Sequence, residues 1–392
     1  MTDDPAARLR TPEGMNALAA AAEVADRDPL AAASALRSRG VAPELAAAAL
    51  TQVELRRRAA GKFGPAAEAM FFTRAGLEQA TRAVVADRRA ARLAASGVKS
   101  LVDLGCGLGS DALAAARAGI RVYAVDADPV TAALAAANAE AAGLQEMIRV
   151  ECRDATGVEV REYDAVFADP ARRRAGGGGR VFDPKSYSPP WDFVAGLPGR
   201  VPRTVLKLAP GIGHELLPPG AEGQWVSVGG DLVEAAFWCG PLAEVPRRAT
   251  LLPAAHELTG TGEAKARVGE LGAYVFDPDP AVVRSHLVAE FAETIGGRLA
   301  DPEIAYVYAD DPVETPFGRR LEITDVLPFS LKRLRALLRE RGVGRLEIRK
   351  RGSALEPDKL RRDLRLSGPG AASMILTRVA GAPTVLLCKP TS

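Results

Sequence analysis

The sequence has few cysteines and histidines and no long hydrophobic run. Its four cysteines, Cys106, Cys152, Cys239 and Cys388, are scattered without Cys-x-x-Cys spacing, which argues against a disulfide framework and a zinc site. The three histidines are dispersed as well. No apolar run approaches the roughly 20 residues that span a membrane, and the acidic start MTDDPAARLR is unlike a signal peptide. We therefore expect a cytoplasmic protein with no metal and no membrane partner.

Aromatic residues are also scarce, at 5% of the chain, whereas the overall composition is ordinary for a globular protein. The length of 392 residues allows two or three domains with substantial cores. The net charge of +2 alone says little about partners. The distribution of charge along the chain is more informative and is considered below.

The most informative stretch is 99–129, which reads KSLVDLGCGLGSDALAAARAGIRVYAVDADP. We expect a strand over 101–104, a glycine-rich turn, an alanine-rich helix and a second strand that ends in Asp126. Glycines let the backbone turn sharply and approach a ligand closely. An acid about 20 residues after such glycines can accept hydrogen bonds from ribose hydroxyls. This order predicts a nucleoside-cofactor site, and a tight turn without a ligand is the alternative.

The loop departs from the dinucleotide fingerprint G-x-G-x-x-G/A, because Ser110 stands at its last position. An acid two residues before the first glycine is also unusual for that fingerprint. Instead, D-L-G-C-G-x-G resembles motif I of the class I S-adenosylmethionine-dependent methyltransferases. The resemblance implies S-adenosylmethionine as the cofactor. It also implies these cofactor-binding residues, with Asp154 assigned to the adenine amine: Asp103, Gly105, Gly107, Asp126 and Asp154.

Residues 1–95 are expected to form an all-helical domain, with prolines at helix starts and glycines at helix ends. Near its end, FFTRAGLEQAT resembles the segment before motif I in trimethylguanosine-synthase-like methyltransferases, where it folds over the cofactor pocket. The resemblance implies that Phe72 and Thr73 contact the cofactor. The alternative is core packing by the phenylalanines and capping by Thr73 of a helix over 76–93.

A second motif, ADPARR, lies in the stretch 163–173, where we expect a buried strand that ends in Asp-Pro. Asp169-Pro170 then lies at the carboxyl edge of the sheet, where open α/β folds bind ligands. The motif resembles [DN]-P-P-[YFW], motif IV of the nucleic-acid amino-methyltransferases, but ends in Ala171-Arg172. The resemblance implies that Asp169 and the Pro170 carbonyl accept hydrogen bonds from a target amine, and that Arg172 holds a phosphate or the substrate base. Stacking on the base then falls to Phe182, Tyr187 or Trp191, which otherwise only anchor a loop.

Strands expected over 204–209 and in a hairpin over 224–238 complete the Rossmann-like seven-stranded α/β sheet of this family, and 240–253 reads as a linker. The C-terminal part has α+β signals, and its segment KRGSALEPDKLRRDLRLSG resembles the THUMP-like domain of certain bacterial methyltransferases. The whole chain resembles that family. We therefore expect three domains: 1–95 helical, 96–240 class I methyltransferase, and 250–392 α+β THUMP-like.

Positive charge is concentrated in residues 331–365, with 13 Lys or Arg against 5 Asp or Glu. The segment carries +8, so the rest of the chain sums to −6. Such segregation suits a polyanion, although a solvated basic helix and loop is the alternative. Because THUMP domains bind RNA, the resemblance implies tRNA or rRNA as the partner. The candidate RNA-binding residues are Lys332, Arg333, Arg349, Lys350, Arg351, Arg361 and Arg362.

The sequence thus predicts an S-adenosylmethionine-dependent methyltransferase that acts on a base nitrogen of RNA. Two alternatives stay open. One is a methyltransferase for a small molecule or a protein, in which the C-terminal domain is only structural. The other is an RNA-binding protein that binds the cofactor without turnover, because D-P-A-R departs from the usual motif.

Overall fold

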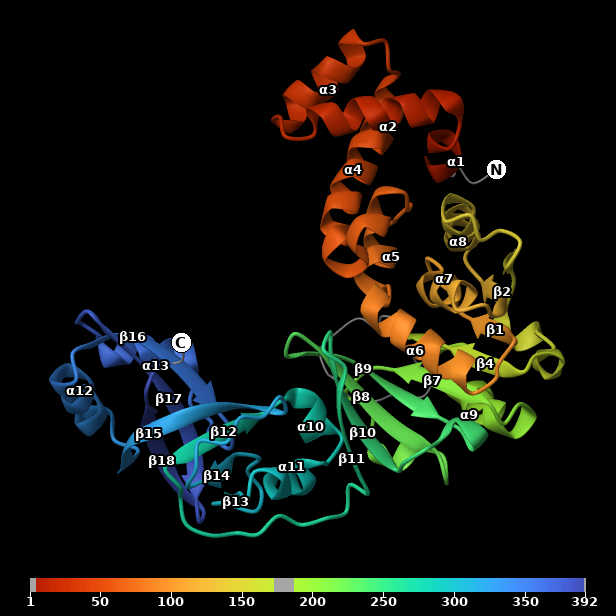
Figure 1. Cartoon of the computed structure of the whole chain (residues 1–392). Coiled ribbons are helices and arrows are strands. Elements are labelled where there is room, and N and C mark those ends of the chain that lie inside the picture. Colours follow the sequence, from red (N-terminus) through yellow and green to blue (C-terminus); the bar gives the residue numbers. More distant parts are fainter. Residues whose placement is uncertain (1–4, 173–186, 391–392) are drawn as a thin grey trace. The chain divides into compact units, whose positions relative to one another are not determined.

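The computed structural model describes residues 5–172 and 187–390 (Figure 1). Residue contacts group the chain into two compact units. The first runs from the N-terminus to Leu208 and adds 212–221 and 236–243. The second takes 209–211, 222–235 and the chain from Glu244 onward. The three-domain division with boundaries near 95 and 240–250 stays a prediction.

The N-terminal part of the first unit is helical, as expected. Its helices are α1 (Pro5–Leu9), α2 (Pro12–Val24), α3 (Pro29–Ser38) and α4 (Pro43–Phe63). Each begins with a proline, whose missing N–H costs nothing in the first helical turn. Thr11 and Asp28 cap α2 and α3 by accepting backbone N–H groups through their side chains.

The single helix expected over 76–93 is wrong, because the structure divides it into α5 (Arg74–Gln79) and α6 (Ala83–Ala95). Ala80 is extended between them. The Lys62 ammonium on α4 donates to three carbonyl oxygens at the end of α5, those of Leu77, Glu78 and Ala80. This side chain satisfies carbonyls that the break leaves without helical partners. No glycine or proline marks the break, so it has no local signal in the sequence.

The core of the larger sheet is five parallel strands in the order β3, β2, β1, β4, β7. All of them except the edge strand β3 are mostly apolar and largely buried, as in parallel sheets covered on both faces. The strands are β1 (Ser100–Leu104), β2 (Arg121–Asp126), β3 (Ile148–Cys152), β4 (Ala165–Ala168) and β7 (Thr204–Leu208). The helices α7 (Ser110–Arg117), α8 (Pro129–Ala141) and α9 (Trp191–Arg200) lie between them in the chain. A short pair, β5 (Ala171–Arg172) and β6 (Tyr187–Ser188), is separate.

Four more strands give the sheet the order β11-β10-β8-β9-β7-β4-β1-β2-β3. The strands β8 (Glu222–Val228) and β9 (Asp231–Trp238) are the expected hairpin pair, whereas β10 (Arg247–Leu252) and β11 (His256–Gly260) are additional. The linker expected over 240–253 is therefore wrong for 247–252, which pairs in parallel with β8. This strand was not predicted because it contains two arginines. Burial of Arg248 is possible because it forms ion pairs with three carboxylates, those of Glu222, Glu244 and Glu257.

The second unit contains a separate sheet in the order β13-β14-β12-β15-β18-β17-β16. Its strands are β12 (Tyr274–Pro278), β13 (Arg298–Leu299), β14 (Val307–Ala309), β15 (Gly318–Pro328), β16 (Val343–Lys350), β17 (Gly370–Val379) and β18 (Ala382–Cys388). Leucines of α12 (Leu331–Glu340) and α13 (Pro357–Leu364) share a buried cluster with β16, β17 and β18. Two short helices, α10 (Pro280–Arg284) and α11 (Val288–Thr294), follow β12, and His286 adopts a φ of 63° between them.

Within the described ranges 5–172 and 187–390, no helix combines the length and apolar character needed to cross a membrane.

Candidate functional site

The glycine loop, residues 105–109, connects β1 to α7 at the carboxyl edge of the parallel sheet. Gly105, Gly107 and Gly109 have φ values of 91°, 55° and 83°, a conformation that side chains with a Cβ rarely adopt. The N–H groups of Gly105 and Cys106 both donate to the Val125 carbonyl oxygen, at 2.9 and 3.0 Å. The loop is thereby tied to the end of β2.

The D-P-A-R motif lies directly against this loop. A Cβ on Gly105 would come within 3.1 Å of the Asp169 carbonyl oxygen, so glycine permits the close approach. The Asp169 N–H donates to the Leu104 carbonyl oxygen at 3.3 Å. The two segments that the sequence marked for cofactor and substrate are thus brought together at one edge of the sheet.

Asp126 closes the other side of the loop. Its carboxylate accepts the N–H of Gly107 at 3.1 Å and that of Asp128 at 3.0 Å. Burial raises the pKa of Asp126, and these two hydrogen bonds oppose the increase. The predicted ribose-binding acid is therefore also a structural support of the glycine loop.

Asp103 is the most unusual group of the site. Its side chain is 1% exposed, and within the described ranges neither carboxylate oxygen has a hydrogen-bond partner. Burial raises the pKa of Asp103 well above its usual range, and the nearby carboxylates of Asp111 and Asp169 raise it further. A buried acceptor without a donor fits a ligand that brings a cationic donor of its own. The loop, Asp126 and Asp103 together fit S-adenosylmethionine, whose methionine end carries an ammonium group.

A second buried acid, Asp111 in the first turn of α7, is fully partnered. It accepts hydrogen bonds from Arg89 Nε at 2.9 Å and from the Thr81 hydroxyl at 2.6 Å. Burial would raise the pKa of Asp111, but the charges of Arg89 and Lys207 and these hydrogen bonds together lower it. The Arg89 guanidinium also lies over the Phe167 ring, 4.8 Å from its centroid.

Lys207 is a site residue to which the sequence analysis assigned no role. It lies on β7, and its Nζ is 2.5 Å from Asp169 Oδ2. The signal was present in the sequence: a lysine within the buried run TVLKLA is rare unless its charge is paired. Identifying the partner required the β4–β7 pairing, which places the ends of the two strands side by side.

The FFTR segment is held by two amide side chains. Asn138 on α8 exchanges hydrogen bonds with the backbone of Phe71 at 2.7 and 3.2 Å, and also donates to the Leu108 carbonyl oxygen at 2.9 Å. Gln52 on α4 does the same for Phe72, at 2.6 and 3.1 Å. The segment is thereby fixed beside the glycine loop.

Phe72 is buried and lies 5.6 Å from Phe63, centroid to centroid, while Thr73 caps α5 by accepting the Gly76 N–H at 2.9 Å. The alternative reading as packing and capping is thus correct for both residues, and their contact with the cofactor stays a prediction. Both also line a cavity of about 550 Å³ between α4 and α8. Other lining residues include Leu45, Ala48, Leu55, Val130 and Leu134.

The remaining candidates of the first unit are placed as follows. Asp154 follows β3, as expected, and its Oδ1 accepts the Thr156 N–H at 2.8 Å. Pro170 is buried beside Asp169. The Arg172 side chain and Phe182 lie outside the described residues. Tyr187 and Trp191 are buried with their ring centroids 6.0 Å apart, which favours anchoring over base stacking.

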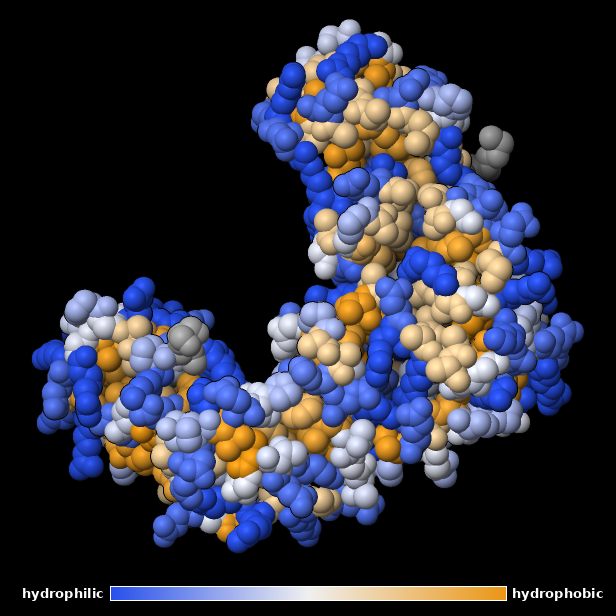
Figure 2. All heavy atoms as spheres, in the orientation of Figure 1, coloured by the Kyte–Doolittle hydropathy of each residue, from blue (hydrophilic) through white to orange (hydrophobic). Residues whose placement is uncertain are grey.

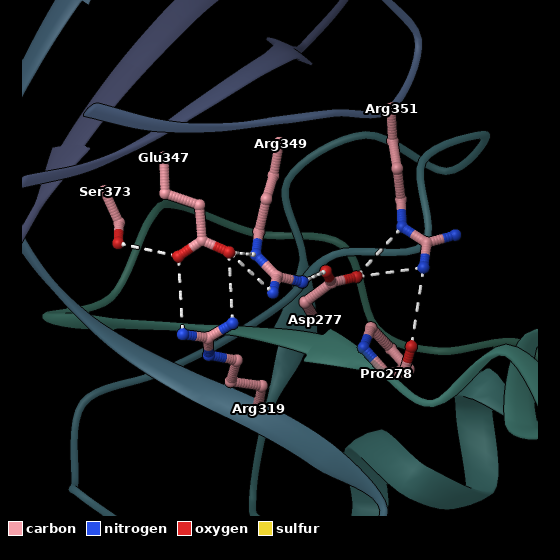
Figure 3. Close-up of polar contacts among 7 residues, drawn as sticks. All are labelled: Asp277, Pro278, Arg319, Glu347, Arg349, Arg351 and Ser373. Atoms are coloured by element: carbon pink, nitrogen blue, oxygen red, sulfur yellow. Dashed lines mark hydrogen bonds and ion pairs between the residues drawn. The ribbon is translucent and has the colours of Figure 1, made fainter. Parts of the chain in front are cut away.

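Several predicted RNA-binding residues are engaged in ion pairs within the second unit (Figure 3). Asp277 accepts hydrogen bonds from Arg349 at 2.6 Å and from Arg351 at 2.9 Å, and Arg349 also pairs with Glu347. Two further candidates pair with carboxylates nearby: Lys350 with Glu356, and Arg361 with Asp358.

Lys332, Arg333 and Arg362 differ from these residues. All three are exposed, and no carboxylate of the described chain lies within ion-pair distance of them. Lys332 and Arg333 lie in the first turn of α12, where Figure 2 shows mainly hydrophilic residues. Of the seven candidates, these three are the most available to a phosphate.

In the described ranges, no group of three or more His, Cys, Asp or Glu side chains gathers that could hold a metal ion.

Comparison with known proteins identifies related sequences along most of the chain. Residues 101–171 match a family model described as a methyltransferase domain, and residues 318–390 match the THUMP domain-like family. Residues 3–59 match a domain of unknown function. An uncharacterized S-adenosylmethionine-dependent methyltransferase of Mycobacterium tuberculosis is 35% identical over 355 residues, covering 86% of this chain and 95% of the relative.

Two other matches cover different shares of the chain. A crystal structure of a protein assigned as a methyltransferase from Porphyromonas gingivalis W83 has a TM-score of 0.73 at 22% identity, covering 96% of this chain and 99% of that one. The 23S rRNA (uracil(1939)-C(5))-methyltransferase of Acidithiobacillus ferrooxidans is 33% identical over 105 residues, 25% of this chain and 24% of the relative. The sequence relationship to the mycobacterial protein and the two family models agree on the same family. The chain belongs to the bacterial S-adenosylmethionine-dependent methyltransferases that carry a C-terminal THUMP-like domain.

Proposed function

We propose that this methyltransferase modifies RNA, tRNA or rRNA, at a base nitrogen. The observation that carries the proposal is the position of Asp169. Its backbone lies against Gly105 of the cofactor loop, and its carboxylate is 33% exposed. A target amine can therefore reach the Asp169 carboxylate next to the methyl group of S-adenosylmethionine.

The residues of this site have separate roles in the proposed reaction. Bound S-adenosylmethionine supplies an already activated methyl group, so alignment and exclusion of water are the main tasks of the protein. Asp169 Oδ1 accepts a hydrogen bond from the amine and so directs the nitrogen lone pair toward the donor. The Pro170 carbonyl accepts the second hydrogen, and Arg172 holds a phosphate or the base. Asp103, Gly105, Gly107, Asp126 and Asp154 hold the cofactor, with Phe72 and Thr73 against it.

The choice of RNA is supported by two observations of different kinds. The match of residues 318–390 to the THUMP domain-like family and the similarity to an rRNA methyltransferase both favour a nucleic acid. The exposed cations at the start of α12 and in α13 supply groups that can contact phosphates. We assign this contact to Lys332, Arg333 and Arg362 first, and to Arg349, Lys350, Arg351 and Arg361 only where RNA displaces their carboxylate partners.

The experiment that tests the proposal is methyl transfer with tritiated S-adenosylmethionine and undermodified cellular RNA. Label that is released by ribonuclease and recovered in a base-methylated nucleoside supports it. Label that resists ribonuclease and is sensitive to protease would assign the activity to a protein substrate. Label found on the ribose would retain RNA but exclude the base nitrogen.

A further inference from the structure

The buried cation of the site, Lys207, has a position that core packing does not explain. It is the next-to-last residue of β7, between the apolar residues Leu206 and Leu208. Its side chain is 12% exposed and its ammonium contacts Asp169. Removing a lysine from water is costly unless a partner compensates it, and an apolar residue of similar volume serves packing as well. The contact with Asp169, a proposed catalytic residue, gives the charge of Lys207 a possible role in the reaction.

The groups around Lys207 come from every element that meets at this edge. Asp103 on β1 and Asp111 on α7 both interact electrostatically with it. Cations are present as well: Lys62 on α4 interacts with Lys207 and with Arg82, and Arg89 on α6 pairs with Asp111. Asp126 is a further acid near Asp103. Among the described cations named here, Arg89 is engaged by Asp111 and Lys62 by the carbonyls of α5, whereas Lys207 contacts Asp169.

We propose that Lys207 is the positioning residue of the transfer reaction: its ammonium fixes one oxygen of Asp169 and thereby directs the other toward the acceptor. Lys207 holds Asp169 Oδ2. The carboxylate therefore cannot rotate freely, and Oδ1 is left for the target amine. This inference rests on the proposed role of Asp169, and it adds a residue that neither sequence motif contains.

The same cation affects the cofactor side of the site. Lys207 opposes the raised pKa of Asp103, so its removal favours the protonated form of that carboxyl. A neutral Asp103 attracts a cationic donor less strongly. Loss of Lys207 should therefore weaken cofactor binding increasingly as the pH falls, an effect that can be measured without any RNA substrate.

The test compares K207M, which keeps the length of the side chain, with K207R, which keeps the charge. The control is R117M, which also removes one cation from the first unit but from an exposed pair with Asp87 on the surface of α7. Each variant is assayed for methyl transfer to undermodified RNA, for S-adenosylhomocysteine affinity from mildly alkaline to mildly acidic pH, and for thermal stability.

We expect K207M to lower kcat by about 10²-fold, the loss typical of a misplaced reacting group, with little change in the KM for RNA. Its affinity for S-adenosylhomocysteine should decline at a higher pH than in the wild type. K207R should recover most of both losses, and R117M should behave as the wild type. Because Lys207 acts through Asp169, the double variant K207M/D169A should be no slower than D169A alone.

Three results would overturn the inference while leaving the proposed function intact. The first is that the D169A variant is inactive while the K207M variant has the kcat of the wild type. Another is a K207M that loses only stability, with full turnover in the folded fraction and an unchanged pH dependence of cofactor binding. The last is additive losses in the double variant. In contrast, full activity in D169A would reject the proposed role of Asp169 itself.

Discussion

The Asp126 carboxylate accepts the backbone N–H of Gly107 at 3.1 Å, so the acid assigned to the cofactor ribose also supports the loop assigned to the rest of the cofactor. Two functions therefore depend on one side chain. A substitution at this position is expected to remove the predicted ribose contact and one hydrogen bond that supports the loop.

We expect Asp126→Ala to weaken S-adenosylhomocysteine binding by roughly 1–3 kcal/mol, the cost of leaving hydrogen-bonding groups unmatched. Isothermal titration calorimetry measures the change. Asp128→Ala is the matched control, because Asp128 caps α8 through the Thr131 N–H and not the glycine loop. An equal loss of affinity in both variants would indicate a general effect on this edge of the sheet. Tight NAD binding by the wild type would contradict the cofactor assignment.

We expect Asp103 to strengthen cofactor binding and to lower the folding stability of the cofactor-free protein. Its raised pKa means that the folded state binds the proton more tightly than the unfolded chain does. Between the unfolded pKa of about 4 and the raised folded value, stability therefore falls as the pH rises. We expect Asp103→Asn to raise the melting temperature of the cofactor-free protein at neutral pH and to flatten its pH dependence.

The same substitution should reduce S-adenosylhomocysteine affinity at least tenfold, because the amide keeps an acceptor oxygen but cannot supply the negative charge that attracts a cationic donor. Thermal unfolding over a pH series and calorimetry give the two readouts. A variant that melts lower at neutral pH would mean that the ionised carboxylate stabilises the free protein, contrary to its lack of partners.

Asp169→Ala separates a catalytic aspartate from a turn-capping one. If Asp169 orients the amine, turnover in the folded fraction should fall by about 10²-fold or more while cofactor affinity stays near wild type. The melting temperature should fall as well, because Lys207 loses its partner. A cap would instead cost about 0.5–2 kcal/mol of stability, with turnover retained in the folded fraction. Asp169→Asn keeps an acceptor oxygen and should retain part of the activity.

The basic residues of the second unit should divide into two groups on substitution. Joint replacement of Lys332, Arg333 and Arg362 by alanine should weaken RNA binding and reduce the salt dependence, by about 0.7 in the log–log slope for each lost contact to single-stranded RNA. Binding measured over a salt series tests this, and cofactor affinity serves as the internal control. An unchanged slope would place the RNA elsewhere on the protein.

Arg349 and Arg351 should respond differently, because they share the carboxylate of Asp277, whose side chain is only 12% exposed. Replacing both with alanine leaves that charge uncompensated, and we expect a loss of about 1–3 kcal/mol in the stability of the protein. Denaturant unfolding measures it. A double variant that is fully stable but binds RNA more weakly would indicate that Arg349 and Arg351 contact RNA.

The sequence was most informative where function depends on backbone conformation and strand order. Glycines with positive φ, an acid at the end of β2 and Asp-Pro after β4 are local signals, and the order of parallel strands brings them to one edge. The partners of Lys207 and Asp111 could not be predicted, since each lies on an element distant in the chain. For the same reason Arg349 and Arg351 read as a free basic surface, although they pair with Asp277, 72 and 74 positions away. Lys350 and Arg361 pair with the nearby Glu356 and Asp358.

The hydrogen bonds between Asn138 and Phe71 join residues 67 positions apart. The segment beside the glycine loop precedes the sheet in the chain, but its anchor is near the end of α8. During synthesis the N-terminal helices emerge first, and this anchor cannot form until α8 has left the ribosome and packed. The anchoring of the FFTR segment is therefore finished only by a non-local contact, and a nascent chain that stops short of α8 has the helices but lacks this support of the predicted cofactor site.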